Sequence, residues 1–256
     1  MKSRFIFFII CLFHLSGNIC FASDEKRESD FAEAINRVLM QGKAVWLEAE
    51  GKKFFGIYNQ GEKVTSKGAV IILHDMGGHP DQQPVIHDLR TFLSEHDWST
   101  LALQMPLREV GVDMEDYYVL FPEAVSRIQA GIRYAKSNGA ESIIIVGYGL
   151  GGLMGIYAQS EQMLDIKALV VISLPVPKTE NKAAQTLQFM RRIKIPMLDI
   201  YGALDLPEVT LSAKDRRQAA KENEAYRQVK IDDEGHEYLH DEGLLVKRIY
   251  SWLGAK

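Results

Sequence analysis

The chain has 256 residues and a formal net charge of -4 at pH 7; 46% of its residues are hydrophobic and 25% are charged. This balance is that of an ordinary soluble globular protein with enough apolar residues for a packed core. The acidic balance excludes the basic surface that a nucleic-acid-binding protein needs, so we expect no nucleic acid among the partners.

The first 22 residues differ in composition from the rest of the chain. Lys2 and Arg4 stand before an apolar block over residues 5–15, and small residues follow up to Ala22. Together these features predict a secretory signal peptide over residues 1–22. The block is too short to span a bilayer comfortably, so we expect an exported protein, periplasmic or secreted, with no integral membrane span after cleavage. An uncleaved anchor is the alternative.

Both cysteines of the chain, Cys11 and Cys20, lie inside this first segment. After cleavage no thiol remains, which excludes a disulfide, a cysteine nucleophile and a cysteine zinc site. Lipid attachment at Cys20 is disfavoured, because a bulky Ile19 stands where lipoprotein signals have a small residue. The exported protein must then be stable through its core alone.

A helix and a hairpin are predicted next in the chain. Residues 24–41 predict a charged helix, whose apolar face consists of Phe31, Ile35, Val38 and Leu39. Residues 44–50 and 52–60 predict two strands joined at Gly51, as an antiparallel hairpin.

From residue 68 onward, apolar runs alternate with helical patterns. The predicted strands cover residues 68–76, 99–106, 142–149, 166–175, 195–202 and 225–232. The predicted helices cover residues 85–95, 116–137, 182–192, 210–223 and 239–253, with one more beginning near residue 150. This alternation predicts an α/β fold, with a mostly parallel central sheet and helices on both faces. We expect a single domain over residues 23–256.

Ligands of such sheets bind beyond the carboxyl ends of the strands. Gly149, Asp205 and His236 follow three of the predicted strands in this order. They resemble the nucleophile, acid and histidine positions of the α/β-hydrolase superfamily, and nearly all of the chain after residue 22 fits that fold. The resemblance implies Asp205 as the catalytic acid and His236 as the base.

Two further stretches resemble known hydrolase sequences. The stretch LHDMGG, residues 73–78, resembles the loop that supplies one oxyanion-hole amide, which implies Met76 for this amide and Leu150 for the other. Residues 77–106 look like an uncharacterised family of exported bacterial hydrolase-like proteins that lack the nucleophilic serine. No assigned reaction comes with that closer resemblance.

Gly149 stands where the resemblance implies the nucleophile, and it has no side chain with which to attack. The turn holds its central residue at a strained, positive φ that glycine tolerates without cost. We therefore expect a pseudo-hydrolase that keeps Asp205 and His236 as a vestigial acid and base and acts by binding. The alternative is an ester or acyl hydrolase in which His236 serves water or a displaced nucleophile. The partner would be an envelope component or a small acyl- or ester-type ligand.

More polar side chains surround the expected site. We place His74, His79 and Tyr148 at the pocket rim, with the Tyr148 side chain directed away from the nucleophile position. The two histidines and Asp75 would bind a metal or an anion or, as we favour, His74 and Asp75 fix the loop by hydrogen bonds. Ser173 ends the next strand, too far along the sheet to meet the base without rearrangement.

Two motifs point to other chemistry. HEYLH, residues 236–240, matches the H-E-x-x-H pattern of zinc proteases, which needs His236 and His240 one helical turn apart and a third ligand. Val246 stands where the longer pattern has histidine, and His236 is expected before the helix begins, so this alternative is remote. The glycines of residues 146–152 resemble a dinucleotide-binding turn, but no acid ends the next strand. We expect neither a metal nor a cofactor.

The loops predict an open site. Only residues 174–181 stand between one predicted strand and the next helix, where most hydrolases of this fold carry a lid, so we expect no sizeable lid. Tyr117, Tyr118 and Phe121 would then form an apolar rim. An open surface of this kind suits a macromolecular partner at least as well as a sequestered substrate.

Overall fold

The structure is a computed structural model, and it describes residues 23–62, 68–240 and 243–254. The predicted signal peptide, with both cysteines, lies outside the described residues. In these ranges, no helix combines the length and the apolar character that crossing a bilayer requires.

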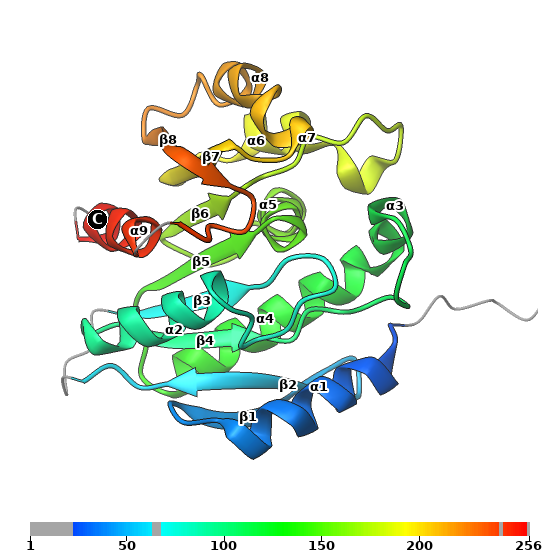
Figure 1. Ribbon diagram of the computed structural model, residues 1–256, viewed down its shortest axis with the longest axis vertical. Helices are drawn as coiled ribbons and strands as arrows, with labels where there is room; N and C mark the ends of the chain where they lie inside the picture. The colour runs from blue at the N-terminus through cyan, green and yellow to red at the C-terminus, as the bar shows by residue number, and fades with distance from the viewer. Residues whose placement is uncertain (1–22, 63–67, 241–242, 255–256) are drawn as a thin grey trace, which may run out of the picture.

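One eight-stranded sheet runs through the described residues (Figure 1). Its strands are β1 (Lys43–Ala49), β2 (Lys52–Asn59), β3 (Ala69–Leu73), β4 (Ser99–Leu103), β5 (Ile143–Tyr148), β6 (Ala168–Ile172), β7 (Met197–Leu204) and β8 (Tyr226–Gly235). They lie in the order β1-β2-β4-β3-β5-β6-β7-β8. The pairs β1/β2 and β2/β4 are antiparallel, and all other neighbours are parallel. The prediction of a mostly parallel sheet with an N-terminal hairpin is confirmed.

Helices cover both faces of this sheet. They are α1 (Glu25–Val38), α2 (Val85–Glu95), α3 (Met114–Tyr117), α4 (Phe121–Ser137), α5 (Leu150–Gln162), α6 (Thr186–Arg192), α7 (Pro207–Thr210), α8 (Ala213–Ala219) and α9 (Leu244–Leu253), with 3-10 turns η1 (Tyr118–Leu120) and η2 (Lys182–Ala184). In Figure 1, α2 and α9 lie on one side of the sheet and α4 and α5 on the other. The α1 helix packs against β2.

The parallel strands are buried on both faces, which explains their continuous apolar sequences. Successive side chains of a strand point to opposite faces. In β3, Ile71 and Leu73 accordingly join the core under α4 and α5, whereas Val70 and Ile72 join the core under α2 and α9. The two cores fix the sheet from both sides, and the sheet in turn fixes the positions of the strand ends.

Several predicted boundaries were wrong. The helix expected over residues 116–137 is divided into α3, η1 and α4, and the one expected over 210–223 into α7 and α8. The last helix begins at Leu244 instead of residue 239, which leaves residues 236–240 in a loop. Val38, expected on the apolar face of α1, has 69% of its surface exposed.

The expected apolar rim does not exist as such. Tyr117, Tyr118 and Phe121 are all buried, with at most 4% of their surface exposed, because α3 and η1 fold these rings into the core below α4. The segment between β6 and α6 carries only η2, so this stretch holds no large lid.

Candidate functional site

The site forms where five neighbouring strands end. The strands β3, β5, β6, β7 and β8 are adjacent and parallel, so their carboxyl ends meet at one edge of the sheet. Just beyond these ends lie Asp75, Gly149, Ser173, Asp205 and His236. Residues up to 161 positions apart in the chain are thereby brought into contact.

Gly149 forms the sharp turn between β5 and α5. Its φ of 52° and ψ of -119° are outside the regions that residues with side chains prefer. The Gly149 N–H donates to the carbonyl of Ile172 on the neighbouring strand, and its carbonyl accepts from Leu153 N–H in α5. Strand, turn and helix thus have the arrangement that the hydrolase resemblance implies for a nucleophile.

The Asp75 carboxylate fills the space where a nucleophilic side chain would lie. A Cβ atom built on Gly149 would be only 2.0 Å from Asp75 Oδ1 and 2.2 Å from its Cγ. The Leu150 N–H donates to the same Oδ1 at 2.6 Å. The Asp75 carboxylate therefore lies where the missing side chain would be. It also accepts the hydrogen bond of the Leu150 N–H, the amide that the resemblance implies for an oxyanion hole.

His236 lies between two carboxylates. Its Nε2 is 2.9 Å from Asp75 Oδ2, and its Nδ1 is 2.8 Å from Asp205 Oδ1. The structure thus brings Asp205 and His236 together in the order that the sequence predicts. Asp75, His236 and Asp205 thus form a row of three side chains. Asp75 lies on the side of His236 where the resemblance implies a serine hydroxyl hydrogen-bonded to the imidazole.

The two carboxylates determine the charge of His236. Burial alone would lower its pKa, but the hydrogen bonds to Asp205 and Asp75 outweigh burial and raise the pKa to about 10. Burial would likewise raise the pKa of Asp205, yet the hydrogen bonds from His236, Ser173 and Leu206 N–H hold it below its usual range. At neutral pH His236 is therefore an imidazolium that lies between Asp75 and Asp205.

Ser173 and Tyr238 complete the surroundings of Asp205. The Ser173 hydroxyl donates to Asp205 Oδ2 and lies 3.0 Å from the Tyr238 hydroxyl. Ser173 (φ 53°) and Tyr238 (φ 53°) both have left-handed backbones, which cost about 1–3 kcal/mol each unless the surroundings enforce them. As predicted, Ser173 does not reach His236, but it contacts the acid.

Tyr148 is closer to the site than predicted. Instead of pointing away, its ring stacks on the His236 ring with 5.1 Å between centroids. Its hydroxyl donates to the His236 carbonyl at 2.8 Å. Side chains of β5 alternate between faces, and this one points to the face that the loop after β8 crosses, which explains the contact.

His74 was also misplaced, because it lies under the loop rather than at a rim. It is 2% exposed, and burial lowers its pKa to about 3, so the ring is neutral. Its Nδ1 lies 2.7 Å from the Asp75 carbonyl, and its Nε2 accepts from Met105 N–H at 2.9 Å. The expectation that His74 fixes this loop by hydrogen bonds therefore agrees with its contacts.

The rest of the loop after β3 is fastened to α1. Arg27 donates to the carbonyls of Gly77 and Arg108 at 3.0 and 2.8 Å. His79 is half-buried beside the ring of Phe31, and burial lowers the pKa of His79. The Met76 side chain is 40% exposed. None of these residues has a hydrogen bond to His236 among those of the described chain, whereas the three atoms nearest to a Cβ built on Gly149 all belong to Asp75.

Sequence reasoning missed the role of Asp75. It assigned this residue to loop stability, whereas the carboxylate reaches Gly149 because β3 and β5 are neighbours. One signal in the sequence was available. An acid, Asp75, stands near the end of one predicted strand, and the neighbouring strand of the resembled fold ends at Gly149 without a nucleophile. Ser173 and Tyr238 carried no comparable signal.

The zinc motif lacks its helix. His236 and His240 lie in the loop between β8 and α9, so they are not one helical turn apart, and the His236 ring is held by two aspartates. Within the described ranges, no three His, Cys, Asp or Glu residues are grouped so that they could hold a metal ion.

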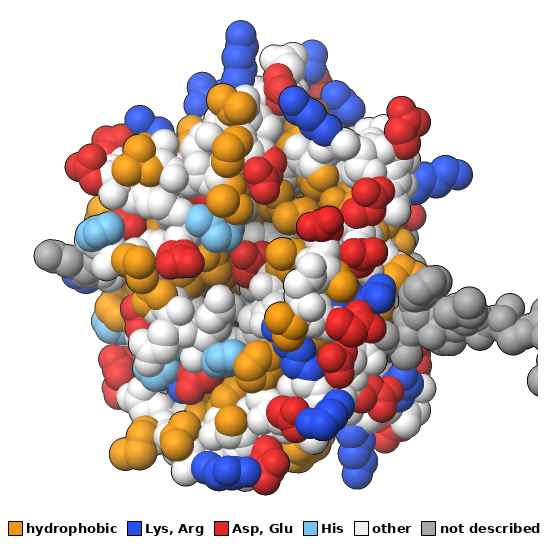
Figure 2. All heavy atoms as spheres, turned by 45° about the vertical axis from the view of Figure 1, so that its right-hand side comes forward, with side chains coloured by type: hydrophobic (Ala, Val, Ile, Leu, Met, Phe, Trp, Pro, Cys, Tyr) orange, Lys and Arg blue, Asp and Glu red, His pale blue; other side chains and the backbone are white. Residues whose placement is uncertain are grey.

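The surface next to His236 is open and partly apolar. A cavity of about 440 Å³ lies beside the imidazole, lined by residues 204–207 and 235–240. Leu204 and Leu239 at its border are 72% and 67% exposed. Figure 2, in which the carboxyl ends of the strands face forward, shows hydrophobic side chains between charged ones on this side.

Solved structures share this fold. Est1E from Butyrivibrio proteoclasticus has 19% identity and a TM-score of 0.65, over 84% of this chain and all of that chain. A Pyrococcus furiosus esterase has 17% identity and a TM-score of 0.68, over 86% of this chain and 92% of its own. A serine hydrolase homologue from Coxiella burnetii has 15% identity and a TM-score of 0.63, over 84% and 97%. At these identities the likeness shows the α/β-hydrolase fold.

Sequence comparison assigns the family. A comparison with curated proteins found no match. The model of a family described as "Protein of unknown function (DUF3530)" matches residues 21–115 and 121–255, which is most of the chain. The chain therefore belongs to the DUF3530 family, and it has the α/β-hydrolase fold.

Proposed function

We propose that this chain is an exported pseudo-hydrolase, which has kept the hydrolase fold and acts by binding rather than by serine-type hydrolysis. The single observation that carries the proposal is the Asp75 carboxylate in the space next to Gly149. Export rests on the predicted signal peptide. The partner is an envelope component or a small acyl- or ester-type ligand, which reaches the open surface beside His236.

The electrostatics of the row support this proposal. A general base must be unprotonated at working pH in order to take a proton from an attacking group. The pKa of His236, raised to about 10 by its two carboxylate partners, leaves the imidazole protonated at neutral pH. In addition, the Leu150 N–H is already engaged by Asp75 and is not free for a substrate oxyanion.

A fluorophosphonate probe tests the proposal on the mature protein. We expect no covalent labelling and no turnover of short-chain nitrophenyl esters. Labelling or turnover that is lost in His236→Ala but kept in His240→Ala would overturn the proposal, since both histidines lie in the same loop. Turnover that a chelator abolishes and zinc restores would instead favour the metal alternative.

A double variant tests whether only two residues separate this site from a hydrolase. Gly149→Ser alone leaves Asp75 in the way, because the new Cβ would meet its carboxylate at 2.0 Å. Asp75→Gly with Gly149→Ser clears that space, frees Leu150 N–H and removes one of the two carboxylates that keep His236 protonated. We expect probe labelling in this double variant and in neither single variant.

A second candidate function is hydrolysis with Asp75 itself as the displaced nucleophile. The observation in its favour is that Asp75 Oδ2 has the hydrogen bond to His236 that a nucleophile would have. An Asp75 oxygen would bond to the carbonyl carbon of an ester substrate, the bond from that carbon to the leaving oxygen would break, and the leaving oxygen would take the proton of His236. Water would then attack the Asp75 carbonyl carbon of the resulting acyl anhydride, which puts the water oxygen into Asp75, releases the substrate acid and returns a proton to His236.

Isotope labelling distinguishes this second candidate. Turnover in ¹⁸O-water would leave ¹⁸O in the Asp75 carboxylate, detected by mass spectrometry of the peptide that contains it. Asp75→Asn should then abolish turnover. An unlabelled Asp75 after prolonged exposure to reactive esters would leave binding as the function.

A further inference from the structure

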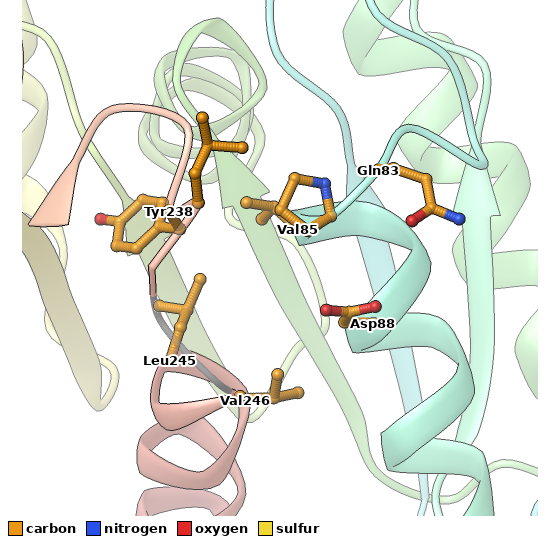
Figure 3. Close-up of a pocket in the computed structure, with 9 residues that line it drawn as sticks. Gln83, Val85, Asp88, Tyr238, Leu245 and Val246 are labelled. Carbon is orange, nitrogen blue, oxygen red and sulfur yellow. The ribbon is translucent and has the colours of Figure 1, made fainter.

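A second cavity lies on the face of the sheet that α2 and α9 cover. Its volume is about 550 Å³, and it lies between the first turns of these two helices and the loop after β8 (Figure 3). Most of its wall is apolar, formed by Pro84, Val85, Tyr238, Leu239, Leu245 and Val246. The volume and the mostly apolar lining are within the range of pockets that bind small organic molecules.

Asp88 brings a negative charge into this apolar wall. It lies in the first turn of α2, and Figure 3 shows its carboxylate directed toward the space between α2 and α9, opposite Leu245 and Val246. The described residues give this carboxylate neither a hydrogen bond nor an ion pair. Burial raises the pKa of Asp88, against a smaller opposite effect of His87.

We propose that this cavity binds a small organic ammonium ion, with the ammonium group on Asp88 and the apolar body against Val85, Leu245 and Val246. A carboxylate that is partly withdrawn from water and lacks a partner is stabilised by an opposite charge. The apolar walls favour a cation with a hydrocarbon body over an inorganic ion, since only the former also buries apolar surface.

Tyr238 connects this cavity with the candidate site. Its ring forms part of the wall, and its hydroxyl lies 3.0 Å from the Ser173 hydroxyl, which donates to Asp205. Tyr238 and Leu239 also line the cavity beside His236. A molecule bound at Asp88 therefore touches the loop that positions His236, and its arrival should be visible in the signals of that histidine.

Benzylammonium is a suitable probe, and titration followed by NMR measures its affinity for the mature protein. We expect saturable binding that shifts the resonances of Tyr238 and His236. Asp88→Asn should weaken binding at least tenfold, whereas Glu95→Gln, which removes a carboxylate from the exposed end of the same helix, should leave it within twofold. Benzyl alcohol, which has the same body without the charge, should bind at least tenfold more weakly.

Three results would overturn the proposal. They are undetectable binding of benzylammonium to the wild-type protein, equal affinities of Asp88→Asn and wild type, and equal affinities of the alcohol and the ammonium ion. Thermal unfolding of Asp88→Asn checks that the variant folds. If it does not fold, Asp88→Glu replaces it, with the expectation that the charge-dependent preference for the ammonium ion persists.

Discussion

Two acidic side chains, one inside β7 and one directly after it, have surroundings that differ in kind. Asp199, inside the strand, is fully buried and bonded to Arg216, with further hydrogen bonds from Tyr226 and Gln228. Asp205 follows the strand and is bonded to His236 at the border of an open cavity. Burial of a carboxylate is common to both, so burial alone does not identify a site.

What separates the two networks is the kind of partner. Arginine side chains are charged at all ordinary pH values, and Arg216 forms a buried ion pair with Asp199. Histidine is a partner whose charge changes with its surroundings, and His236 touches a second carboxylate as well. The first arrangement serves stability, and the second is of the kind found at functional sites.

The largest effect is expected from breaking the structural network. Arg216→Met leaves Asp199 as a buried carboxylate without its cation, which should reduce the free energy of unfolding by about 3–5 kcal/mol. Denaturant unfolding measures the loss. Arg217→Met, at the next and exposed position of α8, is the matched control and should cost less than about 1 kcal/mol.

The same variant also tests whether the two networks are independent. The titration of His236, followed by NMR, should be the same in Arg216→Met as in the wild type. A change in the pKa of His236 would contradict the independence of the Asp199 network from the Asp205 network.

Gly149→Ser should have the next largest effect. The new side chain would be held at a φ of 52° and would displace Asp75, so we expect a loss of about 1–3 kcal/mol from backbone strain, with the clash in addition. Gly139→Ser is the control, because Gly139 also has a positive φ, 87°, but open space around its Cβ position. Unfolding experiments should therefore show a larger loss at position 149.

Coupling with Asp75 separates the clash from the strain. In a double-mutant cycle, Asp75→Gly should recover the part of the loss that comes from the clash, so the double variant is more stable than the sum of the single variants predicts. If the losses of unfolding free energy in the two single variants simply add in the double variant, Asp75 does not occupy the nucleophile position.

The fold could be predicted from the sequence because strands that are buried on both faces of a sheet have continuous apolar sequences. The runs at Ala69–Leu73 and Ile143–Tyr148 are continuous and apolar, and they are strands as predicted. The order of glycine, acid and histidine at the strand ends placed Gly149, Asp205 and His236 correctly relative to the sheet. Such features are local in the chain, or need only the order of the strands.

The parts that failed depend on contacts between distant residues. Asp75 reaches Gly149 because β3 and β5 are neighbours and because His74 fixes the loop after β3 by a hydrogen bond. The late start of α9 reflects a loop that must first bring His236 to Asp205. Neither of these contacts between distant residues produces a periodicity or a motif that can be recognised in a single sequence.

The pH dependence of stability should distinguish the Asp199–Arg216 network from the Asp205–His236 network. The pKa of His236 in the folded protein, about 10, is above the ordinary histidine pKa of 6.5, so its contribution to stability is complete below pH 6.5 and is lost as the pH rises toward 10. Unfolding free energies measured between pH 6 and 10 should fall accordingly. The network of Asp199 and Arg216 contains no histidine, so we expect no such slope from it.

Asp75→Asn sharpens this test, because it removes one of the two carboxylates on His236. We expect the pKa of His236 to fall below about 10, observed by NMR of the imidazole, and the stability loss to begin at lower pH. Glu237→Gln, which removes the neighbouring exposed carboxylate, should leave this pKa almost unchanged. An equal pKa of His236 in Asp75→Asn and wild type would show that Asp75 does not stabilise the protonated imidazole.

The smallest effect is expected at Tyr148, and a second tyrosine makes it informative. Tyr148→Phe removes a neutral hydrogen bond to the His236 carbonyl but keeps the ring in place, so unfolding should become easier by only about 0.5–1.5 kcal/mol. Tyr226→Phe removes a hydroxyl that donates to the buried carboxylate of Asp199, and hydrogen bonds to charged groups contribute about 1.5–3 kcal/mol. Denaturant unfolding of both variants under one set of conditions gives the comparison. If Tyr148→Phe costs as much as Tyr226→Phe, the loop that carries His236 is fixed as firmly as the core, and it would have no freedom to adapt to a ligand.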